Sequence, residues 1–200
     1  MKTSTSRFIP FVLTAFALTF ALSGCFNLGG SGTAATKTVD DKTKIYETDE
    51  FAITLPKTWE VIEKKDFTSD VPAETAVVFR NNVKNESFTA NVVIVKNNLL
   101  EPVITLDYAK MVNNRQESGL FNFKESRKDD FKISVGGNEE PTLFVLFEAK
   151  KAAEEKLVRY LQTYAVKGKS AYIVTGAVSP QDNDSVVKNI EDIVKSFKLK

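Results

Sequence analysis

Leu143-Phe144-Val145-Leu146-Phe147 is the most apolar run in the globular part of the chain, and it predicts the middle strand of a β-sheet. A continuous apolar run of this length is typical of a strand that is buried in a core. Residues 91–95 form a similar run that is apolar on both of its alternating faces, which indicates a second central strand covered on both sides. The chain is therefore expected to be organised around a sheet.

Shorter runs with alternating apolar residues predict the other strands. They lie at residues 45–46, 51–55, 59–62, 75–80, 121–123, 131–135, 157–166 and 171–178. Residues 150–156 are rich in Ala, Lys and Glu, which favours a helix locally, but the long strands on either side favour a hairpin with a loose tip. Gly136-Gly137-Asn138 and Gly168-Lys169 are expected to form tight turns.

Two helices are predicted. Apolar residues recur three apart within residues 105–118, where Thr105 is a candidate cap and Gly119 a stop signal. A second helix follows Pro180, and Asp182, Asn183 or Asp184 is expected to cap it. Its apolar stripe at helical spacing consists of Val186, Val187, Ile190, Ile193, Val194 and Phe197.

The first residues of the chain have the layout of an export signal. Lys2 and Arg7 provide a positive start, and the apolar run over residues 8–22 is too short and too often interrupted to favour a permanent membrane span. Leu22-Ser23-Gly24-Cys25 resembles the lipobox of bacterial lipoproteins. That resemblance implies cleavage between Gly24 and Cys25, a diacylglycerol on the cysteine sulfur and an N-acyl group, such as palmitate, on the new amine.

The alternative interpretation is that Cys25 is an ordinary thiol. Cys25 is the single cysteine of the chain, so an exported protein would have no intramolecular disulfide partner for it. The lipid interpretation is therefore favoured, with the membrane as a partner reached through the anchor. Two or three acyl chains hold a protein firmly at a bilayer, whereas one holds it only marginally.

The expected organisation is a signal peptide at residues 1–24, a flexible tether at residues 25–44 and one globular domain at residues 45–200. The predicted location is the bacterial cell membrane, with the domain facing outside the cytoplasm. Phe26, rather than Asp, follows the cysteine, which favours the outer membrane if the host has one.

Composition narrows the possible chemistry. The chain has 27 Lys and Arg residues against 26 Asp and Glu residues, so it lacks the basic excess expected of a nucleic-acid-binding protein. It has no histidine, so it cannot form a Ser-His-Asp or Cys-His catalytic set or a histidine-containing zinc or copper site. Carboxylate, lysine, tyrosine and serine chemistry remains. We predict no catalytic, metal-binding or cofactor-binding residue.

A few residue patterns were candidates for a site. Residues 182–185 contain acidic and polar side chains, but the spacing of a calcium loop is missing and a helix cap is favoured. The acidic pairs at 129–130, 139–140 and 154–155 are expected to be solvated. Tyr160, Tyr164 and Tyr172 are weak candidates for a binding surface on one face of the closing hairpin, with ordinary sheet packing as the alternative.

Three segments resemble PsbP-like domains of the Mog/PsbP superfamily. Residues 51–61 match an F-x-I-x-x-P-x-x-W opening, residues 160–175 resemble the closing hairpin, and residues 190–197 resemble the last helix with its Ser-Phe end. The resemblance implies an α+β fold, an antiparallel β-sheet flanked by helices in an α/β/α sandwich. It also implies a non-catalytic role. Family metal sites involve histidines, so no binding residue is carried over.

The favoured hypothesis is a membrane-anchored lipoprotein whose non-catalytic domain interacts with, or helps to assemble, an unknown protein partner. The alternative is a lipoprotein that binds a small ligand or a calcium-type metal ion. An enzyme that uses carboxylates or lysine is the least favoured hypothesis, because the residue inventory offers it so few groups.

Overall fold

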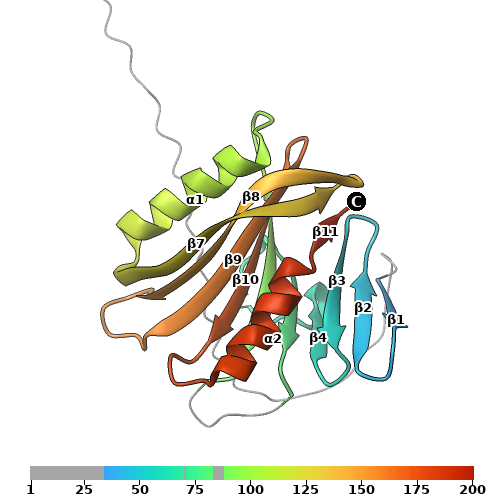
Figure 1. The fold of residues 1–200 in the computed structure, drawn as a ribbon, viewed down its shortest axis with the longest axis horizontal. Coiled ribbons are helices and arrows are strands. Elements are labelled where there is room, and N and C mark those ends of the chain that lie inside the picture. The colour runs from blue at the N-terminus through green and yellow to red at the C-terminus, as the bar shows by residue number, and fades with distance from the viewer. Residues whose placement is uncertain (1–33, 70, 83–87) are drawn as a thin grey trace, which may run out of the picture.

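The computed structural model describes residues 34–69, 71–82 and 88–200. These residues form eleven β-strands, two α-helices and one short 3-10 helix (Figure 1). The strands are β1 (Ala35–Thr38), β2 (Thr43–Glu47), β3 (Phe51–Pro56), β4 (Glu60–Glu63), β5 (Thr75–Arg80), β6 (Asn91–Asn98), β7 (Phe121–Val135), β8 (Asn138–Lys150), β9 (Val158–Lys167), β10 (Ser170–Val178) and β11 (Lys198–Leu199). The helices are α1 (Thr105–Gly119), α2 (Asp184–Lys195) and the 3-10 helix η1 (Lys64–Asp66).

All described strands belong to one sheet, in the order β1-β2-β3-β11-β7-β8-β9-β10-β6-β5-β4. Strand β8 is the sixth of the eleven, so the prediction that residues 143–147 form the middle of the sheet is confirmed. Strand β11 pairs antiparallel with β3 but parallel with β7, while the other neighbours are antiparallel. The sheet is therefore mixed.

The expected architecture, an antiparallel sheet in an α/β/α sandwich, is wrong. The described residues form one large mixed sheet of eleven strands with two short helices, which are too few to make a helical layer on each face. The helical periodicity located both helices, but local patterns did not show how many strands join the sheet. Strand β1 is fully exposed and polar, and β11 has two residues, so neither carries a hydrophobic repeat.

The central strands separate two hydrophobic cores because successive side chains of a strand point to opposite faces. Phe144 and Leu161 enter the core that contains the apolar stripe of α2. Val145 and Tyr164 enter the core that contains the inner face of α1. Helix α1 packs on β8 and β9, and α2 packs on β9 and β10 from the opposite face of the sheet. Burial of their apolar side chains stabilises both contacts.

The sheet curls so that strands near its two opposite edges come into contact. The ring centroids of Tyr46 on β2 and Phe79 on β5 are 5.2 Å apart. Phe51 on β3 also contacts β10, with its ring centroid 6.0 Å from that of Tyr172. The core beneath α2 is therefore enclosed by residues from almost the whole width of the sheet.

The predicted hairpins are confirmed. Strand β8 ends at Lys150 and β9 begins at Val158, so the segment between them is the tip of a strand hairpin rather than a helix. Gly168, between β9 and β10, has a φ of 59°, a left-handed conformation that favours glycine. Gly136 and Gly137 adopt φ angles of 58° and 85° in the turn between β7 and β8.

Ordered structure begins earlier than expected. Strand β1 and the first residues of β2 lie inside the range 25–44 that was expected to be a flexible tether. The two strands pair from Ala35 with Glu47 to Thr38 with Lys44. Backbone pairing, rather than apolar burial, defines β1, which explains why its sequence Ala-Thr-Lys-Thr gave no signal. Residues 25–33 of that range lie outside the described part.

The predicted cap of α2 is confirmed, whereas the predicted cap of α1 is not. Asn183 caps α2 as expected, because its side-chain oxygen accepts hydrogen bonds of 3.1 Å from the amides of Ser185 and Val186. Thr105 does not cap α1. Its hydroxyl donates to Glu140 at 2.7 Å and accepts from the amide of Val166 at 3.2 Å, so it ties the start of α1 to β8 and β9.

Gly176 on β10 marks the closest approach of the sheet to α2. A Cβ atom at this position would lie 2.1 Å from Cγ2 of Ile190. We expect Gly176→Ala to lower the free energy of unfolding by about 1–3 kcal/mol, because the helix must shift to make room. Urea denaturation of both proteins measures the change.

Ile190→Ala provides the matched control, since it removes the methyl group that the new Cβ would meet. The double variant should lose less stability than the two single variants combined. Strictly additive losses would show that contact with Ile190 is not the cause.

Candidate functional site

The predicted lipid-attachment residue Cys25, the cleavage point between Gly24 and Cys25 and the signal peptide at residues 1–24 lie outside the described residues. They remain predictions. Within residues 34–69, 71–82 and 88–200, no helix is both long and apolar enough to cross a membrane. Any further site must be supplied by the folded part of the chain.

The three tyrosines that were weak surface candidates are buried, in agreement with the alternative interpretation of ordinary sheet packing. Tyr160, Tyr164 and Tyr172 are 3%, 0% and 2% exposed. They also lie on opposite faces of the hairpin, because Tyr172 pairs with Ala165, whose side chain points away from that of Tyr164. Tyr160 and Tyr164 pack in the core beneath α1, and Tyr172 packs against Phe51 and Phe197 in the other.

A buried polar chain connects β9 and β10 beneath α1. The Tyr164 hydroxyl donates to Oε1 of Gln162 at 2.9 Å, and Nε2 of Gln162 donates to the Thr175 hydroxyl at 2.9 Å. On α1 itself, the side-chain oxygens of Asn113 and Gln116 are buried and have no hydrogen-bond partner among the described residues. The interface between α1 and the sheet is thus partly polar, unlike the interface of α2.

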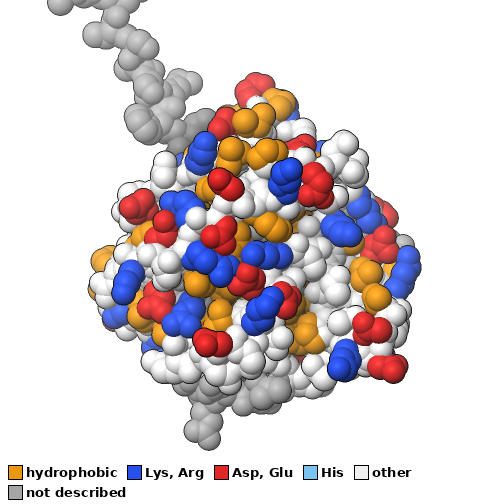
Figure 2. All heavy atoms as spheres, viewed as in Figure 1, with side chains coloured by type: hydrophobic (Ala, Val, Ile, Leu, Met, Phe, Trp, Pro, Cys, Tyr) orange, Lys and Arg blue, Asp and Glu red, His pale blue; other side chains and the backbone are white. Residues whose placement is uncertain are grey.

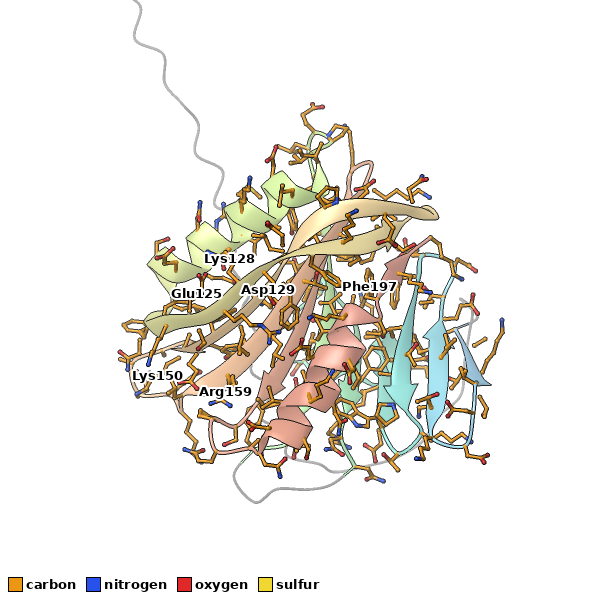
Figure 3. All side chains as sticks on the ribbon, viewed as in Figure 1. Glu125, Lys128, Asp129, Lys150, Arg159 and Phe197 are labelled. Carbon is orange, nitrogen blue, oxygen red and sulfur yellow. The ribbon has the colours of Figure 1, made fainter. Side chains whose placement is uncertain are left out.

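Several of the charged side chains are engaged with one another in ion pairs. Figure 2 shows positive and negative groups intermixed on the face of the molecule that is turned toward the viewer. Lys128 pairs with Glu125 at 2.6 Å, and Arg159 pairs with Glu148 at 2.9 Å (Figure 3). Solvent-accessible pairs of this kind contribute little stability.

The acidic residues do not converge. Among the described residues, no group of three or more Asp, Glu, His or Cys side chains is arranged to hold a metal ion. Asp129 pairs with Arg127 at 3.0 Å. Asp182 accepts a 2.8 Å hydrogen bond from the amide of Ser179, which fits its predicted position before the cap of α2.

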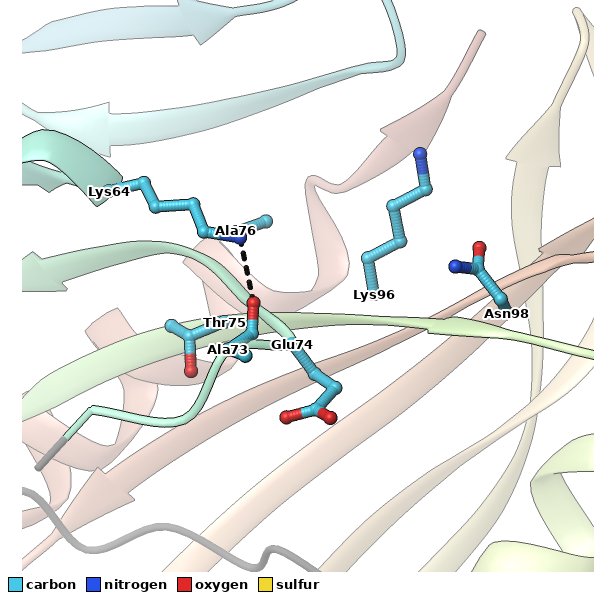
Figure 4. Close-up of a pocket in the computed structure, with 7 residues that line it drawn as sticks. All are labelled: Lys64, Ala73, Glu74, Thr75, Ala76, Lys96 and Asn98. Carbon is cyan, nitrogen blue, oxygen red and sulfur yellow. Dashed lines mark hydrogen bonds between the residues drawn. The ribbon is translucent and has the colours of Figure 1, made fainter.

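One cleft with a polar lining lies where β5 and β6 meet the segment after η1 (Figure 4). Its volume is about 440 Å³. The lining consists of Lys64, Ala73, Glu74, Thr75, Ala76, Lys96 and Asn98. The Lys64 amine donates to the carbonyl of Ala73 at 2.8 Å, and the Lys96 amine pairs with Glu50 on the turn between β2 and β3.

Thr75 is the least expected member of this lining. Its side-chain hydroxyl is fully buried and has no hydrogen-bond partner among the described residues. A buried hydroxyl without a partner costs folding free energy, so such groups are uncommon unless a water or ligand binds them. The lining also carries two amines, one amide and one carboxylate, a set that suits hydrogen bonding to a small polar ligand.

Sequence reasoning missed this cleft because its residues come from separate segments. Residues 64–74 are polar and lie between two predicted strands, and Lys96 and Asn98 follow the apolar run at residues 91–95. Their proximity arises from the irregular pairing of β5 with β6, where the register shifts between Thr75 and Val77. No local pattern in the sequence marks such a shift.

No protein-family model matches the chain, and no curated protein matches its sequence. Among solved structures, a Pseudomonas aeruginosa protein of unknown function is 16% identical, with a TM-score of 0.44 over 70% of this chain and 85% of that one. The cyanobacterial PsbP of Synechocystis is 14% identical, with a TM-score of 0.49 over 87% of this chain and 98% of that one. A Bacteroides thetaiotaomicron protein is 11% identical, with a TM-score of 0.42 over 75% of this chain and 45% of that one.

The side-chain hydroxyls of all five tyrosines should ionise at a higher pH than that of an exposed tyrosine. Burial raises the pKa of Tyr46 to about 12, with a further contribution from the Glu63 carboxylate. Burial also raises the pKa values of Tyr108, Tyr160, Tyr164 and Tyr172 above the usual value of 10. Because the unfolded tyrosines ionise first, the stability of the fold should fall as the pH rises above 10.

We therefore expect the tyrosinate absorbance of the native protein to stay flat near pH 10 and to rise steeply once alkaline unfolding begins. The same protein in concentrated urea should titrate gradually near pH 10. A gradual titration of the native protein at that pH would contradict the burial of these side chains.

Proposed function

We propose that the protein is a bacterial lipoprotein whose folded domain is a non-catalytic binding module outside the cytoplasm. The lipid on Cys25 would hold the chain at the cell membrane, or at the outer membrane if the host has one. The domain would then bind or help to assemble a protein partner. We also propose kinship with the PsbP-like proteins, on the resemblance of residues 51–61, 160–175 and 190–197.

The observation that carries this proposal is the sequence Leu22-Ser23-Gly24-Cys25 after a basic and apolar leader. It combines a branched aliphatic residue, two small residues and the single cysteine of the chain in the required order. Acylation accounts for a cysteine that has no partner within the chain. No other residue pattern in the sequence has so specific a chemical meaning.

Two observations favour binding over catalysis. The chain has no histidine, the residue most often used as general acid or base near neutral pH. The carboxylates that catalysis would need are engaged in ion pairs at several positions, such as Glu60 with Arg80 and Glu191 with Lys195. A carboxylate held by a cation is stabilised in its charged form and is a weak general base.

The intact mass of the protein extracted from the membrane fraction tests the anchor. We expect a chain that begins at Cys25 and carries a diacylglycerol and, if the amine is modified, one further acyl group. Cys25→Ser should abolish the added mass and move the protein to the soluble fraction, because the acyl chains supply the membrane affinity. An unmodified mass, or membrane association retained by a cleaved Cys25→Ser form, would refute the lipid anchor.

A second candidate function is small-ligand binding in the cleft beside β5. The observation that favours it is the buried, unpartnered hydroxyl of Thr75. The lining contains one carboxylate, Glu74, whereas calcium takes six to eight oxygen ligands, so a small polar molecule suits the cleft better than this ion. The two amines favour a ligand that carries carboxylate or phosphate oxygens.

Whether the Thr75 hydroxyl lacks a hydrogen-bond partner can be tested without knowing the ligand. We expect Thr75→Val to raise the free energy of unfolding of the ligand-free protein by about 1 kcal/mol, because it removes an unsatisfied polar group at constant shape. Thermal or urea denaturation measures this change.

Thr142→Val is the matched control, since the Thr142 hydroxyl is buried but donates to the carbonyl of Tyr164 at 2.9 Å. That variant should lose about 1 kcal/mol. Equal losses in both variants would mean that Thr75 is satisfied within the folded chain, and the cleft would lose its support as a ligand site.

A further inference from the structure

The segment between β6 and α1 exposes a cluster of apolar side chains. Leu100, Val103 and Ile104 are 71%, 38% and 65% exposed, and Pro102 between them is also exposed. We call residues 100–104 the apolar loop. The other large exposed hydrophobic side chains of the described residues, Val39, Met111 and Phe121, are not consecutive with one another. Figure 2 shows hydrophobic side chains gathered at the end of the molecule from which α1 starts.

The apolar loop is held in place at both ends, so its exposure is a property of the fold. On one side, the amide of Leu99 donates to the carbonyl of Lys169 at 2.7 Å, which fixes the loop to the turn between β9 and β10. On the other side, the Thr105 hydroxyl is bonded to β8 and β9. These contacts prevent the side chains of the loop from folding back into the core beneath α1.

The described chain begins at this same end of the sheet, as a series of contacts shows. Ala35 pairs with Glu47, and Glu47 pairs with the Lys200 amine at 2.9 Å. The Lys200 amide donates to the carbonyl of Glu50 at 2.8 Å. Glu50 in turn pairs with Lys96, four residues before the apolar loop. The start of β1 and the loop therefore share one end of the molecule.

The length of chain between Cys25 and the fold limits how far this end can lie from an anchoring lipid. Nine residue steps separate Cys25 from Ala34, the first described residue. Even a fully extended chain of that length spans only about 30 Å. A lipid on Cys25 would thus keep the end that carries the apolar loop near the bilayer, with the opposite end directed away.

Ion pairs engage several of the charged groups at the end of the domain that carries the apolar loop, so we do not expect charge to be the main attraction between this end and a membrane. At this end Lys200 is paired with Glu47, Lys96 with Glu50, and the Lys167 amine donates to the carbonyl of Lys200 at 2.8 Å. Glu101 adds a negative charge within the apolar loop. Contact with a membrane would therefore depend on apolar side chains entering the boundary between headgroups and acyl chains, and it would not require anionic lipid.

We propose that the apolar loop inserts into the surface of the membrane that carries the lipid anchor and fixes the orientation of the domain on it. This inference rests on the proposed lipid anchor, because the short tether is what brings the loop to the bilayer. The loop alone would bind weakly, but the tether keeps it at a high effective concentration beside the membrane. Insertion would leave the far end of the sheet, with the turn after β1, facing the solvent.

The test uses the full chain, purified with its lipid and reconstituted into phosphatidylcholine vesicles. Leu100→Cys and Val39→Cys are each labelled with a nitroxide, since acylation leaves Cys25 without a free thiol. Val39 is 55% exposed and follows β1 at the end opposite the apolar loop, so it is the matched control. Collisions with oxygen, which is enriched in the bilayer, are compared with collisions with a polar nickel complex.

We expect the label at position 100 to favour oxygen severalfold over the nickel complex, and the label at position 39 to show the reverse. Equal aqueous accessibility at both positions would overturn the proposal. Shielding of position 100 from both reagents would also overturn it, since a protein partner or a second copy would then cover the loop. Both labelled positions are exposed, and circular dichroism checks that the fold is retained.

Failure of the anchor and failure of the insertion give different results. A chain whose intact mass lacks acyl groups would refute the lipid anchor before any label is read. An acylated, vesicle-bound chain with an aqueous label at position 100 would refute insertion alone.

Discussion

The alternation of side chains along β8 and β9 is the constraint on which the rest of the structure depends. These two strands supply residues to both hydrophobic cores. Each strand is therefore buried on both of its faces, with one core on either side. Phe144 and Val145 are neighbours in the chain, yet both are fully buried in different cores. A shift of one residue in the register would place each side chain in the wrong core.

The two cores differ in character. The core beneath α2 is closed by apolar and aromatic contacts, with the helix lying so close that Gly176 has no room for a side chain. The core beneath α1 contains the Tyr164–Gln162–Thr175 chain and the unpartnered oxygens of Asn113 and Gln116. Buried polar groups without partners weaken an interface, so α1 is expected to be held less tightly than α2. The apolar loop begins where α1 does, at the end that Thr105 fixes.

Local patterns in the sequence correctly predicted those structural features that depend on residues close together in the chain. The middle strand, both helices, the cap at Asn183 and the glycine turns follow from periodicity and backbone preference. The predicted architecture was wrong because β1 and β11 have no apolar repeat in their sequences. Their place in the sheet depends on pairing with other strands, which the sequence of each strand does not show. Tyr160, Tyr164 and Tyr172 remained weak surface candidates because the alternation of a strand does not reveal that both of its faces are covered. The cleft depends on contacts between segments far apart in the chain, so no window of sequence contained it. The apolar loop is a continuous stretch, but its sequence does not show that its side chains are exposed.

Strand β11 has a consequence for the order in which the fold can be completed. Among the described residues, Lys198 and Leu199 are the strand residues that link β3 to the long strands that begin with β7. The bond between the Thr54 amide and the Ser196 hydroxyl, in the same region, joins residues 142 positions apart in the sequence. Strands β1 to β3 therefore cannot be joined to the central strands by backbone hydrogen bonds until the residues of β11 have been made. For the exported lipoprotein proposed above, the sheet would stay incomplete until its last strand is available, which favours passage of the chain across a membrane before folding.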